Sequence, residues 1–282
     1  MNDVSLPPLD VRALLKKYGL QPSKSLGQNF LIDDHALQKI VAAAHLESTD
    51  KVLEIGPGLG NLTRYLALAA SVVTVVELDQ DLFPALKAFI APYPNVRAVQ
   101  GDILKLDPAA LMEMQSYVVV ANIPYYITSA VIRHLLEHDP KPTRMVLTVQ
   151  KEVAERICAE DGKMSLLSLS VQVYGKPGIV AQIPSEAFYP APDVDSSVIR
   201  IEIYPKPVIP AKSLDMFFTI IKAGFSQKRK TLRNSLSAGL RMNPKESEEL
   251  LASVGIDPHR RAETLNLEEW GKLVDKMRNK NL

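Results

Sequence analysis

The first 150 residues of this chain alternate between short β-branched segments and segments with helical periodicity, and this alternation constrains the fold most. In the first helical segment, apolar residues recur at the i, i+3, i+4 and i+7 spacing: Leu62, Tyr65, Leu66 and Ala69. The expected strands span residues 51–55, 72–76, 96–100, 117–121 and 144–149, with helices at 62–69, 81–90 and 128–136. Strands that alternate with helices in this way predict a parallel, doubly wound sheet of the α/β class.

The last third of the chain has a different pattern and is predicted to form a separate domain. Isoleucines at 199, 201 and 203 alternate with other residues, which predicts a late antiparallel edge strand. Prolines at 205, 207 and 210 interrupt both helix and strand, so we place a linker there. Helical spacing then returns at 214–221, 230–240, 246–254 and 267–277. We therefore expect an α/β domain at residues 1–206 and a small all-helical domain at residues 207–282.

Charge is distributed unevenly between these two parts. The whole chain has 33 basic and 32 acidic residues, whereas residues 206–282 hold 15 basic and 9 acidic residues, a balance of +6. A basic appendage on a near-neutral core predicts a polyanionic partner. Its segment Gln227–Arg233 is densely basic, and the residues expected to contact nucleic-acid phosphates are Lys228, Arg229, Lys230 and Arg233. The alternative is an ordinary solvated helix face.

Composition narrows the compartment and the chemistry. The single cysteine, Cys158, excludes an intrachain disulfide and argues against a structural zinc site. The five histidines show no metal-ligand spacing, so no metal is predicted. The first residues lack a secretory signal pattern, and no apolar run reaches the roughly 18 residues of a membrane helix. We expect a cytoplasmic protein that does not enter the membrane.

The first expected strand ends in a glycine-rich turn, and the next two end in acidic residues. The sequence of 54–63 is EIGPGLGNLT, whose glycines allow the backbone to approach a ligand closely. Glu77 ends the second strand, where a carboxylate can accept hydrogen bonds from both ribose hydroxyls. Asp102 follows the third strand and is placed to hold an adenine amino group. Because open α/β sheets bind ligands outside the carboxyl ends of their strands, these features predict one nucleoside pocket.

A dinucleotide-binding site is the competing interpretation of the same features. Its G-x-G-x-x-G/A fingerprint needs a small residue at 61, where this chain has Asn61. A second acid near the cofactor would repel a dinucleotide's phosphates, but it would attract the positive sulfonium of S-adenosylmethionine. The sequence therefore favours S-adenosylmethionine as cofactor. A purely structural glycine turn with solvated acids stays open as an alternative.

The fourth expected strand ends in the segment Asn122-Ile-Pro-Tyr125. The Asn122 side chain offers a carbonyl acceptor and an amide donor, and Pro124 fixes the backbone so that a neighbouring carbonyl can face a ligand. Two carbonyl acceptors aimed at an exocyclic amine would leave its lone pair available for attack. Tyr125 supplies a flat ring on which a base can stack. The alternative is an Asn-capped turn beside a core tyrosine.

These motifs, taken in order, resemble those of the ribosomal RNA adenine N6-dimethyltransferases, and the resemblance spans nearly the whole chain. The segments that carry it are 24–31 (KSLGQNFL), 54–63, 101–102, 122–125, 188–196 (FYPAPDVDS) and 223–236 (AGFSQKRKTLRNSL). The last of these, and the Pro57-Gly-Leu-Gly turn, resemble the small-subunit (16S) branch. Ala191, Ile123 and Tyr126 differ from the commonest family spelling without removing a functional group.

The resemblance implies a Rossmann-like S-adenosylmethionine-dependent methyltransferase sheet. It assigns Asn29 and Leu31 to the methionine and ribose side of the cofactor, Gly56 to packing against it, Glu77 to ribose and Asp102 to adenine. It further implies that Asn122 joins cofactor to target amine and that a backbone carbonyl near Pro124 helps to position this amine. A flipped adenine would lie between the rings of Tyr125 and Phe188.

The implied reaction is dimethylation of N6 on two adjacent adenosines near the 3′ end of 16S rRNA, within a pre-assembled small ribosomal subunit, by a monomeric enzyme. Two rivals stay open from the sequence. One is a large-subunit rRNA adenine N6-methyltransferase that confers macrolide resistance. The other is a non-catalytic nucleic-acid-binding relative with the same fold, against which Asn122 and the series of acids both argue.

Overall fold

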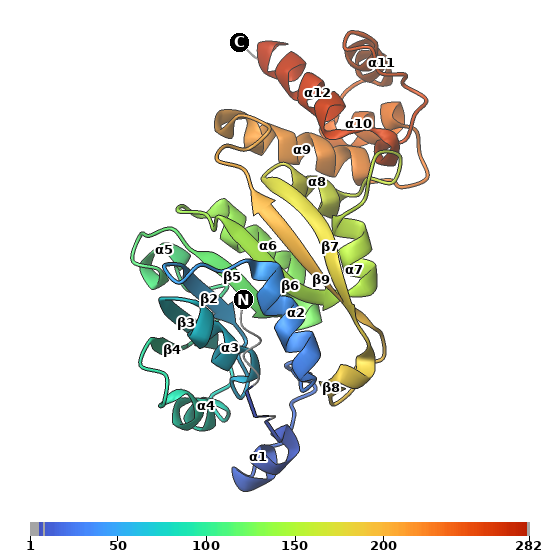
Figure 1. Cartoon of the computed structure of the whole chain (residues 1–282). Coiled ribbons are helices and arrows are strands. Elements are labelled where there is room, and N and C mark those ends of the chain that lie inside the picture. The colour runs from blue at the N-terminus through green and yellow to red at the C-terminus, as the bar shows by residue number, and fades with distance from the viewer. Residues whose placement is uncertain (1–5, 8, 281–282) are drawn as a thin grey trace. The chain divides into compact units, whose positions relative to one another are not determined.

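The computed structural model describes residues 6, 7 and 9–280 and divides the chain into two compact units (Figure 1). The first unit holds the described residues of Met1–Ala154 together with Gly178–Ile203. The second holds Glu155–Pro177 together with the described residues of Tyr204–Leu282. The middle segment of the chain therefore groups with the C-terminal helices, whereas its sequence pattern placed it in the α/β domain. The prolines at 205, 207 and 210 lie close to residue 204, where the chain enters the second unit for the last time. They give no information about residues 155–177, which also belong to that unit. The separate roles predicted for residues 1–206 and 207–282 stay predictions.

The first unit is built on a mixed sheet, which confirms the α/β class. Its strands, in spatial order, are β4 (Val96–Gln100), β3 (Val72–Glu77), β2 (Lys51–Ile55), β5 (Val118–Asn122), β6 (Arg144–Gln150), β9 (Ser196–Ile203) and β7 (Gly175–Ile183). The first five are parallel, and β9 is antiparallel to β6, as its alternating isoleucines predicted. The prediction that this strand lies at the edge is wrong, because β7 lies beyond it. A second, two-stranded sheet pairs β1 (Phe30–Leu31) with β8 (Phe188–Tyr189).

Helices connect these strands and cover the sheet. They are α1 (Val11–Lys17), α2 (Asp34–Ala44), α3 (Asn61–Ala69), α4 (Phe83–Ile90), α5 (Pro108–Leu111), α6 (Thr128–Glu137) and the start of α7 (Lys151–Ile157), with short 3-10 turns η1 (Tyr125–Ile127) and η2 (Ser185–Ala187). Local signals start several of them. Asp33 caps α2 by accepting from the Ala36 amide, and Asp107 caps α5 in the same way.

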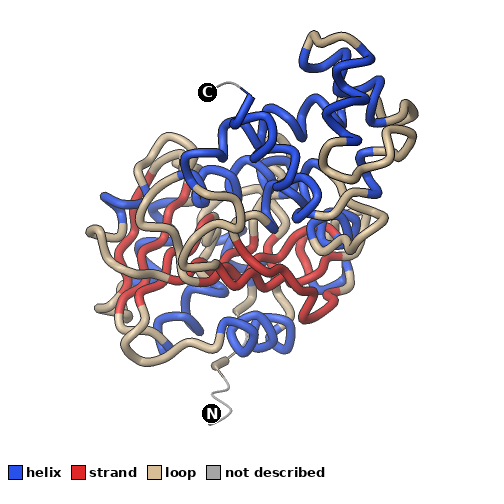
Figure 2. The backbone as a smooth tube through the Cα atoms, turned by 90° about the horizontal axis from the view of Figure 1, so that it is seen from above, coloured by secondary structure: helices blue, strands red, loops and turns tan. Residues whose placement is uncertain are grey.

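The core of the first unit lies on both faces of its central strands. All of Val52–Ile55 and of Val118–Ala121 is buried, as expected when crossover helices cover both faces of a parallel sheet. Figure 2 shows these strands as one twisted layer. Each fully buried aliphatic side chain stabilises the folded state by about 1.5–3 kcal/mol, so the continuous apolar runs that predicted the strands also hold the sheet together.

The order of the strands creates a crevice beside β2. The chain runs outward from β2 to β3 and β4 and then returns to β5 on the other side of β2. The connections after β2 and β5 therefore leave in opposite directions, which is where doubly wound sheets bind ligands. Hydrogen bonds align the carboxyl ends of β2, β3 and β4 with one another. The Gly56 amide donates to the Val76 carbonyl (2.9 Å), and the Gly101 amide donates to the Glu77 carbonyl (2.9 Å).

The second unit is helical. Its elements are the rest of α7, α8 (Leu166–Gln172), α9 (Leu214–Phe225), α10 (Leu232–Leu240), α11 (Pro244–Ala252) and α12 (Leu267–Lys280), with 3-10 turns η3 (Ala211–Ser213) and η4 (Ala262–Thr264). Trp270 is fully buried in its core. A methyl group on Gly224 would lie 2.5 Å from the indole, so glycine is needed for this approach of α9 to α12. Among the described residues, no helix has the length and apolar character needed to cross a membrane.

Candidate nucleoside-binding cleft

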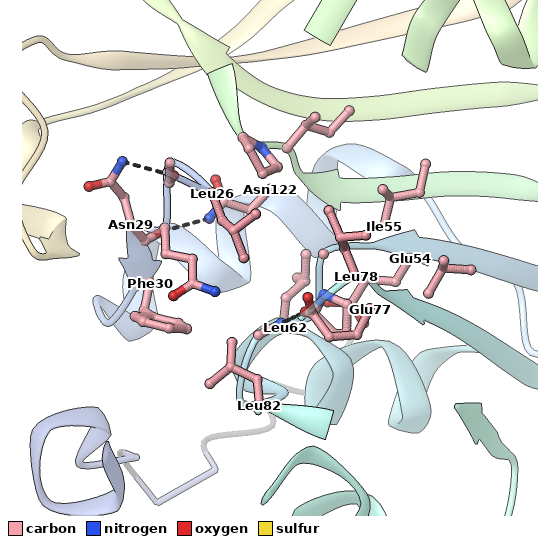
Figure 3. A pocket seen from close by; sticks show the side chains of 18 of the residues that line it. Leu26, Asn29, Phe30, Glu54, Ile55, Leu62, Glu77, Leu78, Leu82 and Asn122 are labelled. Carbon is pink, nitrogen blue, oxygen red and sulfur yellow. Dashed lines mark hydrogen bonds between the residues drawn. The ribbon is translucent and has the colours of Figure 1, made fainter. Parts of the chain in front are cut away.

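The carboxyl ends of β2, β3, β4 and β5 border a cleft of ≈ 1040 Å³, counting the solvent at its mouth. Segment Leu26–Leu31 lines the remaining side, and Figure 3 shows Asn29 and Asn122 close together, with Glu77 and Glu54 across the space. The cleft contains every residue that the resemblance assigned to the cofactor: Asn29, Leu31, Gly56, Glu77, Asp102 and Asn122. The structure thus brings these residues together, and their individual roles stay predictions.

The glycine turn after β2 needs glycine for its backbone and for its close contacts. Gly56, Gly58 and Gly60 have φ of +68°, +59° and +90°, in the left-handed region that other residues rarely adopt. A methyl group on Gly58 would also lie 2.9 Å from ring carbons of Phe30, inside van der Waals contact. The turn leads directly into α3, so the backbone passes the cleft without side chains at these three positions.

Glu77 is held in place by the turn that it faces. One carboxylate oxygen accepts from the Gly58 amide (3.0 Å) and the other from the Asp79 amide (2.8 Å). Burial raises the pKa of Glu77, while these two amides favour its charged form and lower the pKa again. A carboxylate has about four acceptor sites, so each oxygen can still accept one more hydrogen bond from a vicinal diol.

Glu54 is a second acid in the cleft, and the sequence pattern gave it no positive role. It is 1% exposed, and its carboxyl accepts from the Thr63 hydroxyl (2.6 Å), one turn into α3. Burial, together with a smaller effect of the nearby Glu77, raises its pKa to about 8. Near neutral pH the carboxyl of Glu54 is therefore mostly protonated. The sequence feature that could have indicated a role for Glu54 is its position as an acid among the apolar residues of the strand expected at 51–55.

The raised pKa of Glu54 predicts a pH-dependent stability. The folded state binds this proton more tightly than the unfolded chain, where the pKa is near 4.5, so stability falls as pH rises through 8. We expect this group to lower the free energy of unfolding by about 2 kcal/mol between pH 6 and 8. Glu54→Gln keeps an acceptor for Thr63 and removes the titration. Urea denaturation of both proteins at both pH values should show a smaller loss in the variant; equal losses would contradict the assignment.

Asp102 stands where β4 ends, beside apolar side chains. Its Oδ1 accepts from the Leu104 amide (3.0 Å), which fixes the carboxylate in the loop, and Lys105 Nζ lies 3.7 Å from Oδ2. Buried Ile103 and exposed Leu78 also line the cleft. An acid flanked by aliphatic side chains suits a flat heterocycle with an exocyclic amino group. The sequence pattern predicted the two acids, Glu77 and Asp102, but gave no signal for the apolar residue that follows each.

Asn122 is oriented by the segment that covers the cleft. Its Nδ2 donates one of its two N–H groups to the backbone carbonyl of Asn29 (3.1 Å), which orients the amide, and its side-chain carbonyl oxygen accepts no hydrogen bond from any described residue. The carbonyl of Pro124 accepts from the Ile127 amide (3.2 Å) within η1 and retains its second lone pair. The arrangement presents acceptors rather than donors at the end of β5, which suits an amine.

The two aromatic residues that the resemblance placed on either side of a base differ in their exposure to the cleft. Tyr125 lines the cleft, and its hydroxyl forms a 2.6 Å hydrogen bond with Ser196 at the start of β9. Burial raises the pKa of Tyr125, so the phenol stays protonated at neutral pH. Phe188 is 3% exposed, pairs with Leu31 across β1 and β8, and is absent from the cleft lining. Its ring packs in the core, and its predicted contact with a base is untested.

Side-chain hydrogen bonds fasten the covering segment over the cleft. Gln28 donates to Asp79 (2.6 Å), and its side-chain oxygen accepts from the Ser23 amide (2.7 Å). Asn61, at the start of α3, donates to the Leu31 carbonyl (2.7 Å). Sequence reasoning missed the first contact because its partners lie 51 residues apart. The contact ties the cover to the residue whose amide already holds Glu77.

The predicted phosphate-contacting residues lie in the second unit. Lys228, Arg229 and Lys230 are exposed in the turn between α9 and α10, not on a helix, and form no ion pair with any described residue. Arg233, one turn into α10, differs because its Nη1 is 3.0 Å from Glu248 of α11. Three of the four cations are therefore available to a polyanion, and the fourth is shared with an acid. The described residues also hold no group of three or more metal-ligand side chains.

Comparison with known proteins gives consistent matches. A family model described as ribosomal RNA adenine dimethylase matches residues 19–279. Ribosomal RNA small subunit methyltransferase A of Dehalococcoides mccartyi (strain CBDB1) is 48% identical over 272 residues, covering 95% of this chain and 94% of the relative. The protein of that name from Moorella thermoacetica is 42% identical over an alignment of 284 positions, covering 97% and 98%.

Two solved structures are similar over most of the chain. A dimethyladenosine transferase from Plasmodium falciparum matches with a TM-score of 0.76 at 27% identity, covering 90% of this chain and 98% of that one. The 23S rRNA methyltransferase ErmE matches with a TM-score of 0.71 at 28% identity, covering 89% and 100%.

Proposed function

This chain belongs to the ribosomal RNA adenine dimethylase family, and we propose that it transfers methyl groups from S-adenosylmethionine to N6 of two adjacent adenosines near the 3′ end of 16S rRNA. The product is N6,N6-dimethyladenosine in the small ribosomal subunit. The observation that carries the proposal is the convergence of Glu77, Asp102 and Asn122 from three strand ends on one cleft.

The residues of the cleft fit S-adenosylmethionine. Glu77 retains acceptor sites for the ribose hydroxyls, and Asp102 beside Ile103 suits the adenine ring with its amino group. The side-chain-free backbone at Gly56 leaves room for the sugar and the methionine carbons. The acids of the cleft, Glu77 and Asp102, disfavour the phosphates of a dinucleotide. These observations support S-adenosylmethionine as the cofactor.

When bound, S-adenosylmethionine supplies a methyl group on a positively charged sulfur, which leaves as a neutral thioether. Asn122 holds the N6 amine through its side-chain carbonyl, and the bond from its Nδ2 to the Asn29 carbonyl orients the amide group. This acceptor stabilises the positive charge that develops on N6 as the nitrogen–carbon bond forms, and holding the amine in line lowers the barrier further. Tyr125 offers its ring to the base. The nitrogen becomes acidic on methylation, so water takes the proton and no strong general base is required.

The comparisons favour the small-subunit substrate over the two rivals. The relatives named for the small subunit are 42–48% identical to this chain, whereas the 23S rRNA methyltransferase is 28% identical. The non-catalytic alternative is disfavoured because Asn122 and the acids of the cleft are all in place. The test is mass spectrometry of adenosines in small subunits that lack dimethyladenosine, incubated with enzyme and S-adenosylmethionine. Dimethylation of two adjacent adenosines near the 3′ end supports the proposal; modification of large-subunit RNA alone, or none, rejects it.

The exposed cations of the α9–α10 turn are expected to contribute to RNA affinity. Reversal of charge at Lys228, Arg229 and Lys230 should reduce the slope of log K against log salt by about two units, given roughly 0.7 per phosphate contact in single strands. Salt titrations of RNA binding, followed by fluorescence anisotropy, measure this slope. Reversing three exposed lysines of the first unit, Lys16, Lys17 and Lys39, makes the same change in net charge and is the control. Equal slopes in the two triple variants would contradict the assignment.

A further inference from the structure

Tyr126 is an exposed aromatic residue at the cleft that the proposed function has not used. It lines the same cleft as Tyr125 and is the next residue in η1, yet it is 61% exposed. No other described phenylalanine, tyrosine or tryptophan is as exposed. Tyr125 differs because its hydroxyl is bonded to Ser196, whereas no described residue hydrogen-bonds the hydroxyl of Tyr126. An exposed ring beside a binding cleft points to contact with a ligand rather than to packing.

The ring of Tyr126 lies against the backbone of the covering segment. Gly27 has φ of +60°, and a methyl group built on it would lie 3.3 and 3.4 Å from Cδ1 and Cε1 of Tyr126. The absence of a side chain at Gly27 therefore makes room for this ring. Gly27 itself closes a turn, because its amide donates to the Lys24 carbonyl (3.1 Å). The ring is thus positioned before a substrate arrives, which lowers the entropy lost when something stacks on it.

The place of Tyr126 in the fold associates it with the target rather than the cofactor. The residues proposed to hold the cofactor's ribose and adenine follow β3 and β4, whereas Tyr126 follows β5 with Asn122 and Tyr125. A base that enters the cleft beside Asn122 must be turned out of its stack, and the next nucleotide of the strand is then at the mouth. Aromatic side chains stack on any exposed base, so an uncovered neighbouring base suits an uncovered tyrosine.

We propose that Tyr126 is a stacking platform for the nucleobase adjacent to the adenosine being methylated. This proposal rests on the proposed function, since it requires an RNA substrate whose target base enters the cleft. Because the two target adenosines are adjacent, the platform holds one of them while the other reacts. Tyr126 thereby acts as a substrate-binding residue that favours a flipped base with an unpaired base beside it.

The test uses an RNA hairpin with the 3′-terminal small-subunit loop in which the adenosine next to the reacting one is replaced by fluorescent 2-aminopurine. Binding to the full-length protein should quench this base by stacking. Tyr126→Ala should abolish the quenching and raise KM for RNA about tenfold, with kcat changed less than threefold, as expected for loss of one base–aromatic stack. Tyr126→Phe, which keeps the ring, should restore both. Met114→Ala is the matched control. Met114 is also strongly exposed (70%), but it precedes β5, whereas Tyr126 follows it.

The outcomes separate this proposal from the proposed function. If wild-type protein methylates the RNA but Tyr126→Ala retains the quenching and KM, the platform is rejected and the function stands. If Tyr126→Ala lowers kcat with KM unchanged, the ring acts on the reacting base, and the platform is again rejected. If the wild-type protein forms no dimethyladenosine on small-subunit RNA, the proposed function fails and the platform fails with it.

Discussion

Asn122→Ala is expected to lower kcat for methyl transfer about a thousand-fold, the upper range for removing one preorganised polar group that stabilises a transition state. The side chain offers an acceptor at the end of β5, and the bond from its Nδ2 to the Asn29 carbonyl (3.1 Å) orients it. Alanine leaves the target amine without its acceptor while the acids at the ends of β3 and β4 stay in place. We therefore expect the dissociation constant for S-adenosylmethionine to change less than threefold.

Single-turnover transfer of a labelled methyl group to undermethylated small subunits measures the loss, and calorimetry measures cofactor affinity. Asn95→Ala is the matched control, because Asn95 is half-buried, lies outside the cleft and uses its amide to bond the carbonyls of Ala67 and Ala70. A kcat for Asn122→Ala close to that of Asn95→Ala would remove Asn122 from the mechanism. A large loss of cofactor affinity would instead assign it to cofactor binding.

Local sequence signals predicted the parts of the fold that depend on neighbouring residues. The strands expected at 51–55 and 96–100 coincide with β2 and β4, and the helix expected at 62–69 begins one residue earlier, at Asn61. Periodicity carries this information because the burial of a residue in a regular element repeats with the element's own period. Strand ends were predictable for the same reason, and in a parallel sheet they meet at one edge. The composition of the cleft followed from that geometry.

Contacts between distant segments determined what the sequence could not predict. Residues 155–177 group with the second unit, and the burial of Phe188 opposite Leu31 depends on the pairing of β8 with β1. Arg233 was predicted to contact phosphates, and nothing in the sequence indicated its ion pair with Glu248 on the next helix. Each of these outcomes depends on which segments pack together. A motif fixes residue types and leaves that packing open.

The protonation state of a buried acid is another property that the sequence does not determine, and it affects the electrostatics of the cleft. Glu54 and Glu77 are both acids at neighbouring strand positions, yet Glu54 has only the Thr63 hydroxyl as partner, whereas Glu77 has two backbone amides. The pKa of Glu54 consequently rises to about 8, whereas at Glu77 two amides that favour the charged form act against the effect of burial. The same residue type is therefore mostly protonated at neutral pH at one position and held by backbone donors that favour the carboxylate at the other.

This difference predicts a large effect of the Glu→Gln substitution on cofactor affinity at position 77 and a small one at position 54. Glu77→Gln should raise the dissociation constant for S-adenosylmethionine about 30-fold or more, since hydrogen bonds to a charged group contribute about 1.5–3 kcal/mol. The new amide would also direct its N–H groups at a backbone donor, that of Gly58 or of Asp79, and so disturb the turn. Glu54→Gln replaces a carboxyl that is mostly neutral at pH 7 and should change the affinity less than threefold.

Calorimetry with S-adenosylmethionine and with its neutral thioether product distinguishes the two ways in which Glu77 could act. A ribose contact is common to both ligands, so Glu77→Gln should weaken both by the same factor. An effect confined to the cationic ligand would mean that Glu77 attracts the sulfonium and leaves the sugar to other groups. Equal losses for Glu54→Gln and Glu77→Gln would show that the two amides bonded to Glu77 do not set it apart, and the assignment of ribose to Glu77 would then be wrong.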